Sequence, residues 1–393
     1  MVKIRKTIFI ALALVFGMSI YVVEARAAKI KDMDSIKSSI ERYIYLLETE
    51  PCDENSPQEV IGEIKELSSS DIIKESKQTD KKNFLAMTEY LIRRKEMLEN
   101  LSNFDTNEHE KTISIDVLDS SIDKKQASIE VGVEKRWHYS FLTDVESAAY
   151  DKYTFILVNK GGKWLIKDVK GLAESIGAGD LKNLGDAISF SELNGRITQE
   201  KTDLLNQRSL GALMDNTNKN AAVVKGGNSY SRTNAVAYAR KYAINPNSSY
   251  FDFSSPGYGG DCTNYISQCL FAGGILMHPG KKDDENCWYY SKSNDKSSSW
   301  TGAAEFKRYV TGGKSRIKYK NTNWSKVDKG DIIQEVSGGS AYHSMIVTGF
   351  VTSGAYNQRT DITVCSHTPN RKDVLVSKYY TDSKVYHSIL GNK

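Results

Sequence analysis

The sequence changes in character near residue 215, and this change constrains the fold more than any other feature. Residues 28–215 carry 26 lysines and arginines against 35 aspartates and glutamates, a net charge of −9. Residues 216–393 carry 23 against 13, a net charge of +10, and hold 15 of the 22 tyrosines. Because 393 residues exceed the usual size of one hydrophobic core, we expect two domains of different composition.

The first 27 residues have the pattern of a secretory signal peptide. Basic residues precede an apolar run over 7–23, and Ala25-Arg26-Ala27 supplies small residues for cleavage. An uncleaved anchor helix is the alternative, since about 17 apolar residues just span a bilayer. We expect cleavage after residues 1–27, leaving no stable transmembrane segment. The mature protein is then secreted and extracellular, with the cell wall as a site of association.

Residues 28–170 predict an N-terminal α+β domain. Apolar residues at steps of three and four over 30–47 and 82–101 indicate two amphipathic helices. Apolar alternation over 113–169, with a Gly-Gly turn near its end, indicates an antiparallel meander. Helices followed by a curved sheet resemble, in element order alone, the cone-like nuclear-transport-factor-two fold. No catalytic constellation is visible here, and the polar residues 171–228 predict a linker.

The most informative stretch surrounds Cys262. A glycine-rich loop leads into Asp261-Cys262-Thr263, and an apolar-periodic helix follows and ends at Gly273-Gly274. At a helix N-terminus, unpaired N–H groups and the positive end of the dipole favour a thiolate. We therefore predict that Cys262 is a nucleophile, the alternative being a small buried side chain. Cys269, two turns later, has that second role.

A nucleophilic cysteine requires a base and a group that orients the base. His343 stands at the head of an apolar run with strand propensity, shortly after a turn at Gly330-Asp331. The next predicted strand ends in Ser366-His367-Thr368 and delivers a second histidine. His387, near the end of the sequence, is expected to face solvent.

Together these motifs resemble the "putative amidase domain" family of secreted bacterial proteins, a branch of the papain-like cysteine fold. They are similar, more distantly, to NlpC-type peptidases and CHAP amidases. The resemblance covers residues 229–370 of the predicted domain 229–393 and implies a papain-like α+β fold. It implies Cys262 as nucleophile, His343 as general base and later acid, and His367 as the orienting residue. Asn370 or Asp373 are the alternatives to His367.

The mechanism implied by the resemblance is acyl transfer through a thioacyl-enzyme. The backbone N–H of Cys262, next to Asp261, is one oxyanion donor, and Tyr250 or Tyr258 supplies the second. Trp288 either lines an aromatic subsite or packs in the core. The implied substrate is an amide bond in peptidoglycan or its stem peptides.

Two further readings of function stay open. One is a cysteine peptidase or transpeptidase acting on proteins, and the other is a non-catalytic module that binds the cell envelope. No metal or cofactor is predicted, because close paired ligands such as C-x-x-C or H-x-x-x-H are absent from the sequence. Lysines and arginines are scattered without a nucleic-acid-binding motif, so an anionic envelope polymer is the expected partner. The oligomeric state, the bond cleaved and the role of the N-terminal domain are left open.

Overall fold

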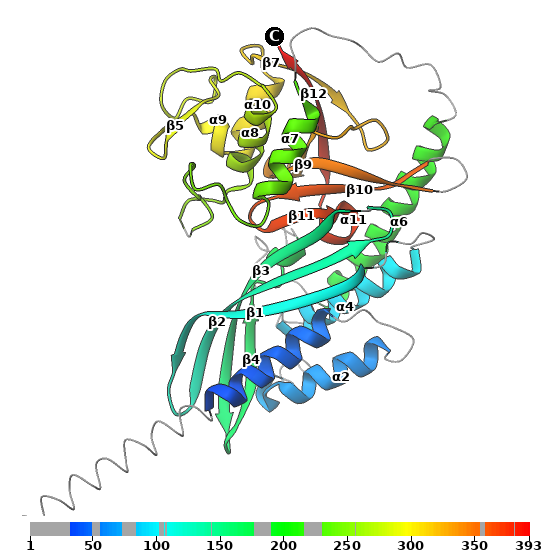
Figure 1. Ribbon diagram of the computed structural model, residues 1–393. Helices are drawn as coiled ribbons and strands as arrows, with labels where there is room; N and C mark the ends of the chain where they lie inside the picture. Colours follow the sequence, from blue (N-terminus) through cyan, green and yellow to red (C-terminus); the bar gives the residue numbers. More distant parts are fainter. Residues whose placement is uncertain are drawn as a thin grey trace, which may run out of the picture.

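The computed structural model describes most of the chain after the predicted signal peptide (Figure 1). The described residues are 32–48, 56–72, 84–101, 106, 108–142, 144–176, 190–215, 230–255, 257–353, 358–380 and 382–393. The predicted signal peptide, residues 1–27, lies outside them, as does much of the predicted linker. Within the described residues, no helix has the length and apolarity that a membrane span needs.

Helices and strands alternate in groups along the chain. The helices are a first helix over residues 32–48, α2 (Pro57–Leu67), α4 (Phe84–Leu101), α6 (Phe190–Asp215), α7 (Arg232–Tyr242), α8 (Cys262–Ala272), α9 (Ser298–Thr301), α10 (Ala303–Thr311), α11 (Val376–Tyr379) and the 3-10 helix η1 (Glu174–Ile176). The strands are β1 (Glu108–Ile122), β2 (Gln126–Tyr139), β3 (Glu146–Lys160), β4 (Lys163–Lys170), β5 (Tyr290–Lys292), β6 (Asp295–Lys296), β7 (Ile317–Thr322), β8 (Ile332–Ser337), β9 (Ser340–Ser353), β10 (Gln358–Ser366), β11 (Asn370–Leu375) and β12 (Lys384–Asn392).

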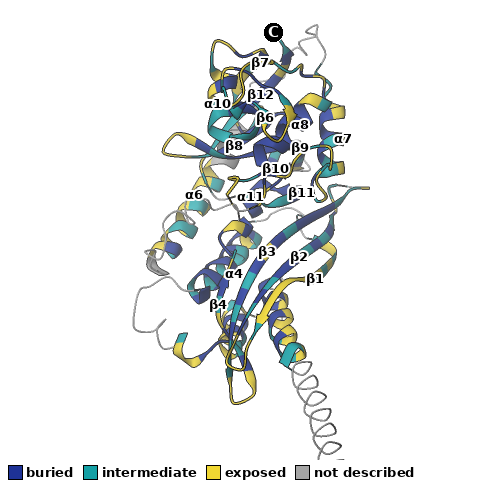
Figure 2. Ribbon diagram, turned by 90° about the vertical axis from the view of Figure 1, so that its left-hand side faces the viewer, coloured by how far each residue is buried: buried dark blue, intermediate teal, exposed yellow. Residues whose placement is uncertain are grey.

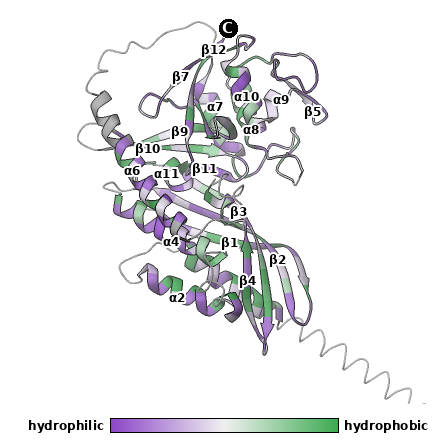
Figure 3. Ribbon diagram, turned by 180° about the vertical axis from the view of Figure 1, so that it is seen from behind, coloured by the Kyte–Doolittle hydropathy of each residue, from purple (hydrophilic) through white to green (hydrophobic). Residues whose placement is uncertain are grey.

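In the N-terminal part, β1–β4 form an antiparallel sheet that curves around the first helix, α2 and α4 (Figure 1). Apolar and polar residues alternate along β2 and β4, as the hydropathy colouring shows (Figure 3). The apolar face meets the helices in one core that includes Tyr43, Phe155 and Trp164. Ser56 and Glu59 form a capping box that starts α2. The predicted α+β class, with an antiparallel sheet, is confirmed, and the sheet is open.

The C-terminal part continues the same sheet. The strand order is β1-β2-β3-β11-β10-β9-β8-β12-β7, with β4 on β3, and all described pairs are antiparallel. β11 pairs with β3 through Asn370 opposite Tyr150 and Arg371 opposite Ala149. The two segments predicted as separate domains therefore share one sheet.

Helices α7, α8 and α10 cover one face of β8–β10 (Figure 1). The other face of these strands packs against α11 and against the end of β2, including Trp137. Because both faces are covered, β8, β9 and β10 are mostly buried (Figure 2). Within the predicted linker, α6 packs against α4, and its Glu200 accepts hydrogen bonds from Arg94.

Candidate active site

Asp261 fixes the start of α8 through four hydrogen bonds. One carboxylate oxygen accepts from the Phe253 amide (3.0 Å) and from Asn264 Nδ2 (2.8 Å). The other lies 2.6 Å from Nδ1 of His367, and the Asp261 amide donates to Thr368 Oγ1. The Asp261 side chain does not cap the first amides of α8. These amides stay available for a negative charge that develops beside Cys262.

Cys262 is the first residue of α8, and its side chain is buried, with 6% exposed. Burial raises the pKa of the thiol. Hydrogen bonds from Thr263 Oγ1, 3.7 Å away, and from the Ser344 amide act in the opposite direction and are the smaller effects. The resting thiol is therefore protonated, which differs from the thiolate expected from the helix N-terminus alone. In a dry site, desolvation outweighs the dipole.

His343 lies near the head of β9 and is 5% exposed. Its ring stacks on Tyr380, with centroids 5.5 Å apart and planes 25° apart. Burial, assisted by the positive charge of Arg371, lowers the pKa of His343 to about 3. The imidazole is therefore neutral, the form that accepts a proton. Its buried Nε2 has no hydrogen-bond partner in the described part of the chain.

Ser344 connects these two side chains. It pairs with Gln334 of β8, whose Nε2 donates to Ser344 Oγ, and its hydroxyl lies 2.9 Å from Thr263 Oγ1. His343 points to the other face of β9, because successive side chains alternate across a strand. Cys262 and His343 share no hydrogen bond among the described residues. In unliganded sites such bonds are often long and tighten when substrate binds.

His367 does not reach His343. Its Nδ1 binds Asp261, its Nε2 lies 2.7 Å from the Tyr242 carbonyl oxygen, and its ring stacks on Tyr265 with centroids 3.9 Å apart. Both ring nitrogens are engaged, so neither is left to orient the base. The structure places His367 as the support of the α8 N-terminus instead of the predicted third residue.

The two alternative orienting residues also point elsewhere. Asn370 Nδ2 donates to the Ile244 carbonyl oxygen. The buried carboxylate of Asp373 accepts bidentate hydrogen bonds from the Arg240 guanidinium. The residue that contacts His343 is Tyr380, which sequence reasoning missed. No local pattern around Tyr380 indicated this contact, because it depends on where α11 ends.

Of the predicted substrate-binding aromatics, Trp288 is corrected by the structure. It is fully buried, and its Nε1 donates to Ser267 Oγ, so it packs in the core and cannot line a subsite. Tyr250 packs against Tyr290 and Trp300. Tyr258 is 57% exposed. Among the described residues, no contact joins either tyrosine to Cys262.

A cleft of about 820 Å³ opens beside His343. One side of the lining comes from Asp252, Gly259, Tyr342, His343 and the turn 368–370. The opposite lining comes from β2, β3 and the segment 171–174. A neutral buried base that lines a cleft and a thiol at the start of a helix are among the parts that acyl transfer requires.

Residues 229–389 match the family model described as "Putative amidase domain". The match coincides with the region that carries Cys262 and His343, and it supports amide-bond hydrolysis as the activity of this region. We refer to residues 229–389 as the amidase domain.

Two curated proteins of Bacillus subtilis (strain 168) are similar to parts of the chain. The uncharacterized protein YhbB is 37% identical over 91 residues, which are 23% of this chain and 26% of YhbB. The uncharacterized protein YjcM is 28% identical over 174 residues, 42% of this chain and 36% of YjcM. The chain thus aligns with about a third or less of each relative's length. No solved structure matches.

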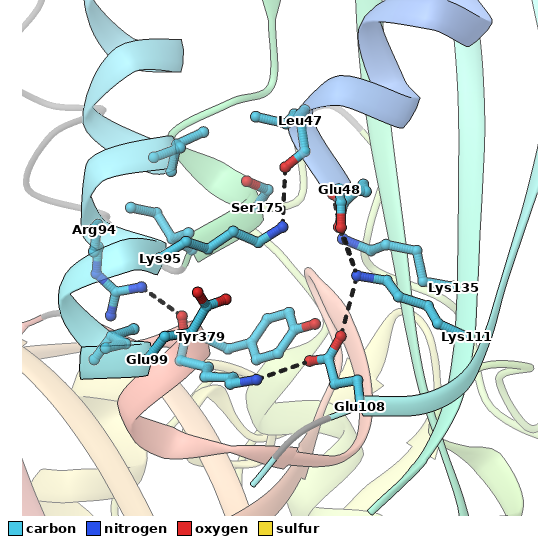
Figure 4. A pocket seen from close by; sticks show the side chains of 14 residues that line it. Leu47, Glu48, Arg94, Lys95, Glu99, Glu108, Lys111, Lys135, Ser175 and Tyr379 are labelled. Atoms are coloured by element: carbon cyan, nitrogen blue, oxygen red, sulfur yellow. Dashed lines mark hydrogen bonds and ion pairs between the residues drawn. The ribbon is translucent and has the colours of Figure 1, made fainter. Parts of the chain in front are cut away.

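A second cavity, of about 80 Å³, lies away from the amidase cleft between the first helix, α4 and α11 (Figure 4). Its charges are largely paired. Lys135 binds Glu48, and Glu108 binds both Lys111 and Lys378. Lys95 donates to the carbonyl oxygen of Leu47 near the end of the first helix. These contacts join the N-terminal part to α11 and supply no nucleophile.

Metal ligation has no support in the described part of the chain. No group of three or more His, Cys, Asp or Glu residues there is arranged to hold an ion. The four described cysteines, at 262, 269, 287 and 365, are free and buried. Cys52 lies outside the described residues.

Proposed function

We propose that this protein is a secreted cysteine amidase that hydrolyses an amide bond in peptidoglycan or its stem peptides. Amide hydrolysis is supported by the family match of residues 229–389. Secretion is supported by the signal-peptide pattern of residues 1–27. The cell-wall substrate is supported by the resemblance to wall-directed cysteine hydrolases and by the net charge of +10 after residue 215, which suits an anionic envelope.

One observation carries the cysteine mechanism. The sulfur of Cys262 accepts a hydrogen bond from the Ser344 amide, and the preceding residue, His343, is a neutral buried base. Its Nε2 has no hydrogen-bond partner among the residues that the structure describes. The backbone of β9 next to His343 therefore contacts the thiol, and His343 itself lines a cleft large enough for a peptide.

The reaction follows from these parts. His343 accepts the thiol proton as Cys262 Sγ forms a bond to the carbonyl carbon, and the oxyanion is stabilised by the uncapped amides at the start of α8. The C–N bond then breaks, and His343 returns the proton to the leaving amine. Water attacks the thioester with His343 again taking a proton. The carboxylic acid leaves and the thiol is restored.

The test uses mature wild-type protein and purified sacculi. New chain ends identified by mass spectrometry are expected with wild-type protein and not with Cys262→Ala. Cys269→Ala is the matched control, because it removes an equally buried thiol from the same helix. Identical digests from wild-type and Cys262→Ala protein would falsify the cysteine mechanism.

A non-catalytic envelope-binding module is the second candidate. It is favoured by the absence of a Cys262–His343 hydrogen bond among the described residues and by the raised pKa of the buried thiol. This candidate predicts undiminished sacculus binding by wild-type and Cys262→Ala protein with no new chain ends from either. A peptidase or transpeptidase instead predicts Cys262-dependent cleavage of a protein, or incorporation of an added amine.

A further inference from the structure

The cleft beside His343 has walls from distant parts of the sequence. The amidase domain supplies one wall, and the N-terminal sheet supplies the other through Glu134 of β2 and Tyr150 of β3. The pairing of β11 with β3 holds the two walls together, with Asn370 opposite Tyr150. The N-terminal sheet, in which the sequence shows no catalytic constellation, is therefore part of the candidate active site.

The side chain of Tyr150 on this wall packs against Gly132. A Cβ at Gly132 would lie 2.2 Å from the Tyr150 hydroxyl oxygen, so the ring rests on a position where only glycine leaves room. Burial raises the pKa of Tyr150, and the nearby carboxylates Asp116, Glu130 and Glu134 raise it further. An aromatic ring thus lies in a field of negative charge.

Carboxylates outnumber cations along the cleft. The acidic lining residues are Glu134, Asp151, Glu174 and Asp252, and the basic one is Lys152. Asp151 is neutralised by ion pairs with Lys135 and Arg371. Among the remaining lining residues, three are acidic and one, Lys152, is basic, so this part of the lining has a negative formal charge that favours cations.

The charge of Glu134 is only partly compensated by its ion pair. Its partner Arg136 also binds Glu146, so one cation is shared by two carboxylates. Glu134 lines the cleft, whereas Glu146 does not. The two glutamates are thus a matched pair that differs in access to the cleft.

An independent feature of the same cleft indicates a ligand. His343 lines this space and is 5% exposed, and its buried Nε2 has no hydrogen-bond partner in the described part of the chain. A buried polar atom without a partner is costly, and a bound polar group relieves that cost.

We propose that the N-terminal wall recognises a protonated primary amine of a peptide substrate, with Glu134 binding the ammonium beside the ring of Tyr150. This inference rests on the proposed amidase function and names its substrate class as amine-bearing peptides. Carboxylates give ammonium groups strong charge-assisted hydrogen bonds, and aromatic faces add a cation–π attraction.

The test measures binding without turnover. Mature Cys262→Ala protein is immobilised and exposed to muropeptides released from sacculi by a glycan hydrolase, either untreated or acetylated on their amines. Mass spectrometry identifies what is retained. Retention of the untreated muropeptides is expected to exceed that of the acetylated ones by about 10-fold, the loss of one charge-assisted bond. Equal retention of both overturns the inference.

Variants locate the site. In the Cys262→Ala background, Glu134→Gln is expected to reduce retention of untreated muropeptides toward the acetylated level. Glu146→Gln removes the other carboxylate that pairs with Arg136, and Glu146 does not line the cleft. This variant is therefore expected to leave retention at or above the parent value. Equal effects of the two substitutions refute a role for Glu134, and melting curves verify that both variants fold.

The two proposals fail in different ways. Amine-dependent retention with no Cys262-dependent cleavage of sacculi rejects the amidase and, with it, the inference as a statement of substrate class. Cleavage by wild-type protein with amine-independent retention rejects the inference alone. Loss of retention in high salt is expected for an ammonium and not for a neutral sugar.

Discussion

Asp261 and His367 are joined by a 2.6 Å contact between Oδ2 and Nδ1, although 106 residues separate them. The contact holds the end of β10 against the start of α8, so it sets the position of Cys262 from outside the helix. His367 is 1% exposed, which makes the contact dry. The pair is therefore a structural support for the nucleophile.

Replacing His367 tests this support. His367→Ala removes the His367 contact from Oδ2 of the buried Asp261 carboxylate and from the Tyr242 carbonyl oxygen, so we expect the free energy of unfolding to fall by about 2–4 kcal/mol. Urea unfolding measures this change. A variant as stable as the wild-type protein contradicts the support role, and His387→Ala serves as a control at another buried histidine.

Alkylation of Cys262 reports the state of the thiol. Because burial raises its pKa, the rate of iodoacetamide labelling is expected to climb with pH and to titrate above the ordinary thiol value of about 8.5. Peptide mapping assigns the label, and free N-acetylcysteine gives the reference rate. A titration below pH 7 would show a preformed thiolate instead.

The acid limb of the pH–rate profile reports His343. Its pKa of about 3 in the folded protein predicts that kcat/KM does not decline through pH 6.5, the ordinary histidine value. Initial rates on solubilised wall fragments between pH 4 and 8 provide the measurement. The same low pKa makes protonation of His343 unfavourable to folding, so stability decreases as pH falls below about 6.5. A limb centred near 6.5 would place the base elsewhere.

The junction of the two sheet halves depends on Arg371. This side chain is fully buried, and it binds Asp151 at 2.6 Å and the Ser175 carbonyl oxygen. Arg371→Met leaves the Asp151 charge with less compensation, and we expect a loss of about 3–5 kcal/mol in the free energy of unfolding. Arg136→Gln, on the more exposed pair of β2, is expected to cost under about 1 kcal/mol. Similar costs for both contradict the prediction.

Acid stability depends on Glu108. Burial opposes ionisation of this carboxyl, but Lys378 and Lys111 outweigh it and lower the pKa to about 2. The folded pKa lies below the unfolded one, so the stabilisation is present above about pH 4.5 and is lost as pH falls toward 2. Glu108→Gln is expected to lower stability at pH 7 and to flatten its decline between pH 4.5 and 2. Thermal unfolding across this range measures both, and an unchanged slope counts against the prediction.

Local sequence was sufficient to predict several elements. The apolar periodicity over 30–47 and 82–101 predicted the first helix and α4, and the alternation after residue 113 predicted strands of the N-terminal sheet. The Gly-Gly-Asp approach to Cys262 predicted the start of α8, because glycines and an apolar-periodic run punctuate helices in any context.

Burial of polar residues was harder to predict. His387, expected to face solvent, is 1% exposed and binds Gln334 Oε1, because β12 is inserted between β7 and β8. A strand near the end of a sequence has no local signal for being central in a sheet. The core position of Trp288 was undecided because it depends on packing against residues that are distant in the sequence.

The sequence by itself determined that Cys262 begins a helix and that His343 heads a strand, since both depend on neighbouring residues. Only the tertiary structure decided their partners. In the folded chain His367 contacts Asp261, Tyr380 stacks on His343, and Arg371 binds Asp151, and each pair is distant in the sequence. The register between β3 and β11 then placed the acidic N-terminal sheet on the cleft. Such contacts follow from strand register and packing of the whole chain, which local periodicity does not contain.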